Sequence, residues 1–158
     1  MARAAPRPTL LYLMKQVELA VRARLDDMVR PDGLTALQYT ALTVLADHPD
    51  LSSAQLARRS FVTAQSMADM VTTLSARGLI ERRRDPADAR RLALSLTRAG
   101  EHLLQTYRAP AAAIEAQMLR GLDRAEATAL RTALEQCRTA LDESAEAGRR
   151  ATPASRRS

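Results

Sequence analysis

The sequence predicts a mainly α-helical fold that carries one small β-hairpin. Apolar residues recur at helical spacing in several segments, whereas residues 92–96 alternate between leucine and smaller residues at period two. Hydrophobic residues make up 46% of the chain, but the aromatics are Phe61 and three tyrosines, so the expected core consists of Leu, Ala, Val and Met. The 158 residues suffice for one domain with a real core.

The first predicted helix occupies residues 10–33 and has one apolar seam. The seam residues recur at steps of three and four. A lone domain of this size is not expected to leave such a seam in solvent, so we expect it to contact a second copy of the chain. The seam consists of Leu10, Met14, Val17, Val21, Leu25, Met28 and Val29, of which the first four are the candidate dimer contacts. Residues 1–9, with two prolines, are expected to be disordered.

Capping signals mark the next three helices. Thr35 with Gln38, and Ser52 with Gln55, each place a hydroxyl residue three positions before a glutamine, which is the pattern of a capping box. Thr63 caps another helix after a very short turn. Two helices joined so closely cross steeply, which leaves one face of the second helix free.

The helix after Thr63 has an apolar stripe and a polar face. The stripe, at positions i, i+3, i+4 and i+7, is expected to face the core. It consists of Met67, Met70, Val71 and Leu74. The opposite face carries small and polar side chains that fit a DNA major groove, where Gln and Ser can bond to base edges. These candidate reader residues are Thr63, Ala64, Gln65, Ser66, Asp69, Thr72 and Thr73. An ordinary amphipathic surface helix is the alternative.

A hairpin is expected to follow this helix. Gly78 ends the helix where a left-handed conformation is favoured, and residues 79–84 begin an extended segment. Residues 92–96 form the second strand, with its leucines on the buried face. The charged segment 85–91 opens with Asp-Pro, and such a long charged loop projects from the domain as a wing. A solvated loop without a DNA contact is the alternative.

Two helices are expected after the hairpin, the first capped by Thr97 and the second by Asp123 with Glu126. Apolar residues of the second helix recur at steps of 3, 4, 3 and 4, as in a coiled coil. The seam consists of Ala127, Leu130, Leu134, Cys137 and Leu141, of which the last four are the candidate dimer contacts. We expect this seam and the seam of the first helix to form a homodimer interface; packing of the two seams inside a monomer is the alternative.

Positive charge is concentrated on the predicted hairpin unit. Residues 51–98 contain nine arginines and four acidic residues, a net charge of +5 out of the +6 of the whole chain. Contact with DNA phosphates requires positive charge on this unit. The candidate phosphate contacts are Arg58, Arg59, Arg77, Arg82, Arg83, Arg84 and Arg98. For each arginine singly, a solvated surface side chain is the alternative.

This order of elements is that of a winged helix-turn-helix, and the hairpin segment resembles the MarR family of dimeric transcription regulators. The residues that carry the resemblance are Leu79-Ile80-Glu81-Arg82, Asp85-Pro86-x-Asp88-x-Arg90-Arg91, and Leu96-Thr97 followed by Gly100. A weaker similarity extends over residues 10–141. The resemblance implies that Asp88 braces the wing through a salt bridge, that Arg90 enters the minor groove beside Arg91, and that residues 63–73 lie in the major groove.

One position departs from the family pattern. Relatives often carry a basic or neutral polar residue in the middle of the recognition helix, where this chain has Asp69. A carboxylate repels phosphate, but it can accept a hydrogen bond from a cytosine amino group. The binding site of this chain therefore cannot be copied from its relatives.

The predicted organisation follows from these elements. It is a disordered N-terminus (1–9), a first dimerisation helix (10–33), a winged helix-turn-helix (34–98), C-terminal dimerisation helices (99–143) and a basic disordered tail (144–158). The resemblance implies a homodimeric repressor that binds an inverted repeat in double-stranded DNA and is released by a small lipophilic or phenolic effector. A protein-interaction module and a nonspecific DNA-binding protein are the alternatives. The sequence identifies no ligand residues.

No catalytic, metal or cofactor site is expected. His48 and His102 lack further ligands at metal-binding spacing, and there is no glycine-rich phosphate loop. The single Cys137 excludes an intramolecular disulfide and, on an apolar seam, is expected to be a buried inert thiol, with a redox sensor as the alternative. The chain lacks an apolar run of membrane-spanning length and the apolar core of a signal peptide, so a cytoplasmic protein with no membrane partner is expected.

Overall fold

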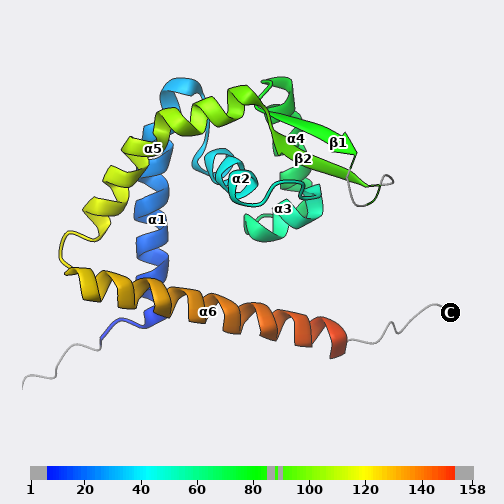
Figure 1. The fold of residues 1–158 in the computed structure, drawn as a ribbon. Helices are drawn as coiled ribbons and strands as arrows, with labels where there is room; N and C mark the ends of the chain where they lie inside the picture. Colours follow the sequence, from blue (N-terminus) through cyan, green and yellow to red (C-terminus); the bar gives the residue numbers. More distant parts are fainter. Residues whose placement is uncertain (1–6, 85–87, 89–90, 152–158) are drawn as a thin grey trace, which may run out of the picture. The chain divides into compact units, whose positions relative to one another are not determined.

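The computed structural model describes residues 7–84, 88 and 91–151, with side chains up to Asp142. The elements are α1 (Leu10–Val29), a 3-10 turn η1 (Arg30–Asp32), α2 (Ala36–Asp47), α3 (Ser53–Arg59), α4 (Ala64–Ala76), β1 (Ile80–Arg84), β2 (Leu92–Leu96), α5 (Arg98–Met118) and α6 (Arg124–Ala151) (Figure 1). This confirms the predicted fold class. The chain forms two compact units, Met1–Ile114 and Glu115–Ser158, which are described separately.

The predicted caps start the helices of the first unit. Thr35 Oγ1 accepts from the Gln38 amide at 3.2 Å while Gln38 Oε1 accepts from the Thr35 amide at 3.0 Å. Ser52 and Gln55 repeat this capping box at the start of α3, with distances of 3.2 and 2.8 Å. Thr63 Oγ1 accepts from the Ser66 amide at 3.1 Å and so caps α4. Each cap satisfies an amide that the first helical turn leaves without a partner.

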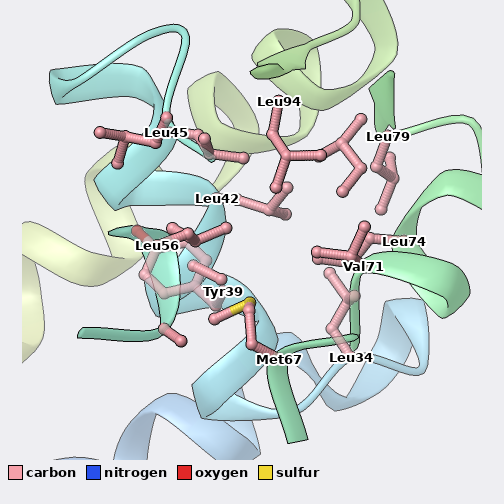
Figure 2. Close-up of a cluster of buried hydrophobic side chains, with 14 of the residues drawn as sticks. Leu34, Tyr39, Leu42, Leu45, Leu56, Met67, Val71, Leu74, Leu79 and Leu94 are labelled. Carbon is pink, nitrogen blue, oxygen red and sulfur yellow. The ribbon is translucent and has the colours of Figure 1, made fainter. Parts of the chain in front are cut away.

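The core of the first unit lies between α2, α3, α4 and the hairpin (Figure 2). Leu42 from α2, Leu56 from α3 and Leu74 from α4 are fully buried in it. Of the predicted α4 stripe, Met67 and Val71 are also buried and Met70 is half-buried against the same cluster. The stripe therefore faces the core as the sequence predicts, and this fixes which face of α4 remains in solvent.

The hairpin is antiparallel, with Ile80 opposite Leu96 and Arg84 opposite Leu92. β2 also bonds to the segment before α3, where the Leu94 amide donates to the Leu51 carbonyl at 2.8 Å. The predicted one-sided burial of β2 is wrong: Ala93 and Leu94 are both buried, whereas Leu92 is 57% exposed. Adjacent strand residues point to opposite faces, so the protein covers both faces of β2 in its middle. Leu92 lies at the wing end of the strand.

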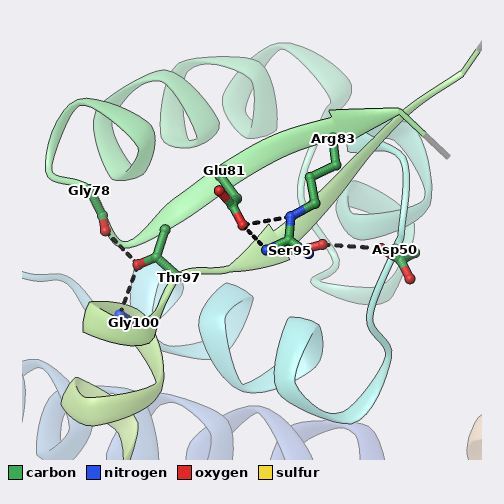
Figure 3. A network of polar contacts seen from close by, with 7 residues as sticks. All are labelled: Asp50, Gly78, Glu81, Arg83, Ser95, Thr97 and Gly100. Carbon is green, nitrogen blue, oxygen red and sulfur yellow. Dashed lines mark hydrogen bonds and ion pairs between the residues drawn. The ribbon is translucent and has the colours of Figure 1, made fainter. Parts of the chain in front are cut away.

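Thr97 joins the hairpin to both helices that flank it (Figure 3). Its hydroxyl donates to the Gly78 carbonyl at 2.5 Å and accepts from the Gly100 amide at 3.2 Å. Gly78 has a φ of 68°, the left-handed conformation that ends α4. A Cβ at Gly100 would lie 2.2 Å from the Leu79 carbonyl oxygen. A glycine here therefore lets α5 begin directly against the first residues of the hairpin.

The second unit contains the end of α5 and all of α6. Asp123 and Glu126 form the predicted cap of α6, each accepting a backbone amide of the other at 2.8 Å. α6 continues to Ala151, so the helix includes residues 144–151, and the prediction of a disordered tail is wrong for these residues. Alanine, glutamate and arginine, which favour helices, dominate this stretch and let the helix continue. Residues 152–158 lie outside the described residues.

Candidate nucleic-acid interface

The solvent face of α4 brings the predicted reader residues together. All seven of them are exposed, whereas the stripe on the opposite side of the helix faces the core. These residues, Thr63, Ala64, Gln65, Ser66, Asp69, Thr72 and Thr73, span nearly the whole length of α4. The structure thus provides one continuous polar helix face that can approach a major groove.

Several polar groups on this face are already paired with one another. Gln65 Nε2 donates to Asp69 Oδ1 at 3.2 Å, across one turn of the helix. The Thr72 and Thr73 hydroxyls donate to the carbonyls four residues earlier, each at 3.0 Å. Thr63 Oγ1 lies 2.9 Å from Ser66 Oγ. These bonds limit which groups remain available to bond to a base.

Three consecutive arginines lie on β1, which leads into the wing. Arg82, Arg83 and Arg84 are all exposed. The Arg83 guanidinium is paired with the Glu81 carboxylate on the same strand, with Nε at 2.6 Å (Figure 3). This ion pair partly neutralises Arg83, so Arg82 and Arg84 carry the stronger positive field of this strand.

Of the predicted wing residues, the structure describes Asp88 and Arg91. Asp88 is exposed and its carbonyl accepts from the Arg91 amide at 2.9 Å. Arg91 Nη2 donates to Gln55 Oε1 at 3.0 Å, which ties the base of the wing to the start of α3. The sequence pattern predicts only the capping role of Gln55, because no local pattern connects residues 36 positions apart. Arg90 lies outside the described residues.

The remaining predicted phosphate contacts have different surroundings. Arg58 and Arg98 are exposed, and Arg59 Nη1 lies 3.2 Å from His48 Nε2. Arg77 instead donates to two backbone carbonyls, Asp32 O at 2.5 Å and Gly33 O at 3.1 Å. Arg77 therefore joins the end of α4 to the turn after α1, a structural role that the sequence pattern does not predict.

The same turn also contacts α5. The Tyr107 hydroxyl donates to Asp32 Oδ2 at 2.5 Å, and the Tyr107 ring meets Tyr39 of α2 edge-on at 6.2 Å between centroids. The hydrogen bond to Asp32 and then burial raise the pKa of Tyr107, and burial raises the pKa of Tyr39. Both rings are buried, so this cluster connects α2, α4 and α5 through the turn after α1.

The predicted dimer residues of α1 fall into two groups. Leu10, Met14 and Val17 are 79%, 51% and 48% exposed, whereas Val21 is half-buried. At the other end of the seam, Val29 is buried in the core of the first unit. Only the last part of the seam thus packs inside the chain, which leaves its first part as an apolar surface.

The seam of α6 is exposed to different degrees. Leu130 and Leu134 are each 37% exposed, and Leu141 is 72% exposed. Cys137 is an exposed free thiol. The expectation of a buried thiol is therefore wrong for the single chain, in which Leu141, the next residue of the seam, is also exposed.

The described part of the chain holds no group of three or more His, Cys, Asp or Glu side chains that could bind a metal ion. Among the helices described, none is long and apolar enough to cross a membrane.

Comparison with known proteins identifies the fold. The sequence pattern of the MarR family matches residues 32–91. The HTH-type transcriptional repressor Rv2887 of Mycobacterium tuberculosis is 32% identical over 108 residues, which are 68% of this chain and 78% of the relative. The chain belongs to the MarR family. It is thus a MarR-family transcriptional regulator, and its relatives carry regulatory names rather than enzymatic ones.

Solved structures of the family have the same architecture. The M. tuberculosis MarR family protein Rv2887 in complex with salicylic acid is 30% identical, has a TM-score of 0.67, and is matched over 83% of this chain and 97% of that one. The Staphylococcus aureus MepR–DNA complex has a TM-score of 0.72 at 21% identity, over 84% and 96% of the two chains. The second similarity concerns the fold alone.

Proposed function

We propose that this MarR-family regulator is a homodimeric repressor that binds an inverted repeat in double-stranded DNA through α4 and the wing. The main support for the proposal is the continuous exposed polar face of α4, on which all seven predicted reader residues lie. Side chains of this size and polarity suit contact with base edges in a major groove. Arg90 and Asp88 keep their family-implied roles in the wing.

The distribution of charge supports DNA as the partner. Arg58, Arg82, Arg84 and Arg98 are exposed, and all belong to the segment with a net charge of +5. A basic surface beside a polar reader helix provides the phosphate contacts that position the helix on the duplex. A protein-interaction module would not need this combination.

The exposed apolar parts of α1 and α6 support a dimer. A second copy would cover leucines that a lone chain leaves in water, such as Leu10 and Leu141. A two-fold dimer presents two α4 helices to half-sites about one turn of DNA apart. The inverted repeat in the proposal follows from this symmetry.

We further propose that a small lipophilic or phenolic molecule releases the repressor from DNA. The support is the relative Rv2887, which has been solved with salicylic acid. Such an effector needs only to bind more tightly to a dimer whose wing separation does not fit the operator.

Selection of bound sequences from a random duplex library tests the proposal. We expect the native protein to enrich an inverted repeat at near-physiological salt. Thr72→Glu adds a negative charge to the exposed face of α4 and should weaken binding to that repeat at least about tenfold, because like charges repel. Binding by fluorescence anisotropy measures this loss.

Thr139→Glu is the matched control. Thr139 is exposed on α6, and its hydroxyl donates to the carbonyl four residues earlier at 3.0 Å, as that of Thr72 does. This control should keep the native affinity for the repeat. Failure to enrich any sequence, with affinity that follows salt alone, would instead favour a nonspecific DNA-binding protein.

A further inference from the structure

The reader face of α4 contains no basic side chain. Residues 64–76 include neither lysine nor arginine, and Asp69 is the charged residue among them. Arginine bonded to guanine O6 and N7 is the commonest specific contact in the major groove. α4 therefore has to recognise its bases through a different set of groups.

The hydroxyls on this face are mostly acceptors toward DNA. Thr72 and Thr73 each donate their hydroxyl hydrogen to a helix carbonyl at 3.0 Å. Their outward lone pairs can accept hydrogen bonds, but the donor of each group is already used. The Asp69 carboxylate is also an acceptor. The face thus suits bases that present amino groups in the major groove.

Gln65 and Asp69 form a pair on this face. Gln65 Nε2 donates to Asp69 Oδ1 at 3.2 Å, and both side chains are exposed. The bond leaves Asp69 Oδ2 free as an acceptor within this pair. In the Gln65 amide, the oxygen and the second N–H remain available, so this side chain offers an acceptor beside a donor.

These groups match two different bases. Cytosine presents the N4 amino donor in the major groove and no acceptor of its own, so it can bond to a carboxylate without repulsion from its own ring. Adenine presents the N6 donor beside the N7 acceptor, which fits the remaining donor and acceptor of a glutamine amide. Guanine and thymine present acceptors to a carboxylate and are disfavoured.

We propose that Gln65 and Asp69 form a coupled base reader, in which Asp69 accepts from a cytosine amino group and holds the Gln65 amide in position for adenine. This inference rests on the proposed function. Four residues advance a helix by about 6 Å. Successive bases are about 3.4 Å apart, so the cytosine and the adenine lie within about two base-pair steps.

Asp69→Asn tests the reader. Asparagine keeps an oxygen that can hold Gln65 but replaces the other oxygen by a donor, and asparagine pairs with adenine. In a random-duplex selection, we expect the variant to keep an inverted repeat but to lose the cytosine preference at one position per half-site. Its affinity for the native repeat should fall about tenfold, because the oxygen that accepts from the cytosine amino group is replaced by a donor.

The coupling is tested with Gln65→Ala, alone and combined with Asp69→Ala. Gln65→Ala alone should relax the adenine preference. Asp69→Ala removes the hydrogen bond that holds the Gln65 amide. In this background, Gln65→Ala should therefore lower the affinity clearly less than it does in the native protein. Equal costs in both backgrounds would contradict the coupling.

The control is Glu101→Gln, which removes one exposed negative charge from α5 and should leave the enriched sequence unchanged. An unchanged cytosine position with Asp69→Asn would overturn the reader while the proposed function stands. A uniform gain of affinity for all sequences would also overturn it, since Asp69 would then act by repelling phosphate. No enrichment by the native protein would overturn both proposals.

Discussion

At the scale of single residues, Asp32 is the point where three parts of the first unit meet. Its carbonyl accepts from Arg77 at the end of α4, and its carboxylate accepts from Tyr107 of α5. Hydrogen bonds to a charged acceptor contribute more than neutral ones. We therefore expect this turn to stabilise the position of α4, although it contains none of the reader residues.

Tyr107→Phe should lower the free energy of unfolding by about 1–2 kcal/mol, because it removes a buried donor to a carboxylate. Urea denaturation followed by circular dichroism measures this loss. Tyr12→Phe is the matched control, since Tyr12 is 57% exposed, and it should leave the stability unchanged. Equal stability of both variants would contradict a stabilising role for the bond.

The pH dependence of the same variant follows from the raised pKa of Tyr107. A group whose pKa is higher in the folded protein binds its proton more tightly there, so its contribution is complete below the unfolded pKa of about 10. The contribution is lost as the pH rises above that value. The stability of the native protein should thus fall above about pH 10 more steeply than that of Tyr107→Phe. Tyr39, whose pKa is also raised, remains in both proteins.

At the scale of elements, the junction between the hairpin and α5 depends on close backbone approach. The Leu79 carbonyl accepts from the Thr97 amide at 3.1 Å, and the same carbonyl oxygen would lie 2.2 Å from a Cβ at position 100. The obstacle is backbone, which cannot move aside as the end of a flexible side chain can. The hairpin or the first turn of α5 would have to shift.

Gly100→Ala should therefore destabilise the protein by about 1–3 kcal/mol, as overpacking does elsewhere. Thermal unfolding of the variant measures the effect. Gly121→Ala is the control, because a Cβ at that glycine would meet nothing within 4 Å. A Gly100→Ala protein as stable as this control would mean that the junction adapts without cost.

At the scale of the whole molecule, the proposed dimer would cover the exposed apolar seams of α1 and α6. Leu134→Glu places a charge on the α6 seam and should convert dimers to monomers in sedimentation velocity, because an unpaired charge in an apolar interface is costly. Gln136→Glu adds the same charge beside the seam and should preserve the dimer. A dimer that persists in Leu134→Glu would show that this seam is not the interface.

The predictions that succeeded concern short-range features. The caps at Thr35, Ser52 and Thr63 join residues three positions apart, and the buried stripe of α4 repeats within two helical turns. The solvent face of α4 follows from the stripe, because the side chains of a helix that do not face the core face outward. The elements and the exposure of the candidate reader residues were therefore predictable from the sequence, whereas their contact with DNA stays a prediction.

The features that local sequence patterns do not predict join distant residues. Arg91 and Gln55 are 36 positions apart, and Tyr107 and Asp32 are 75 positions apart. The burial of Ala93 on the second face of β2 and the exposure of Cys137 also depend on what packs nearby. Local pattern carries no information about such contacts.

The sequence by itself determined the mainly helical fold, the order of its elements and the face of α4 that meets solvent, because capping and hydrophobic periodicity act over a few residues. The tertiary structure alone decided that Arg77 binds the turn after α1 and that Tyr107 binds Asp32. Each of these bonds joins residues that are distant in the sequence, so the choice of partner depends on how the folded backbone brings them together.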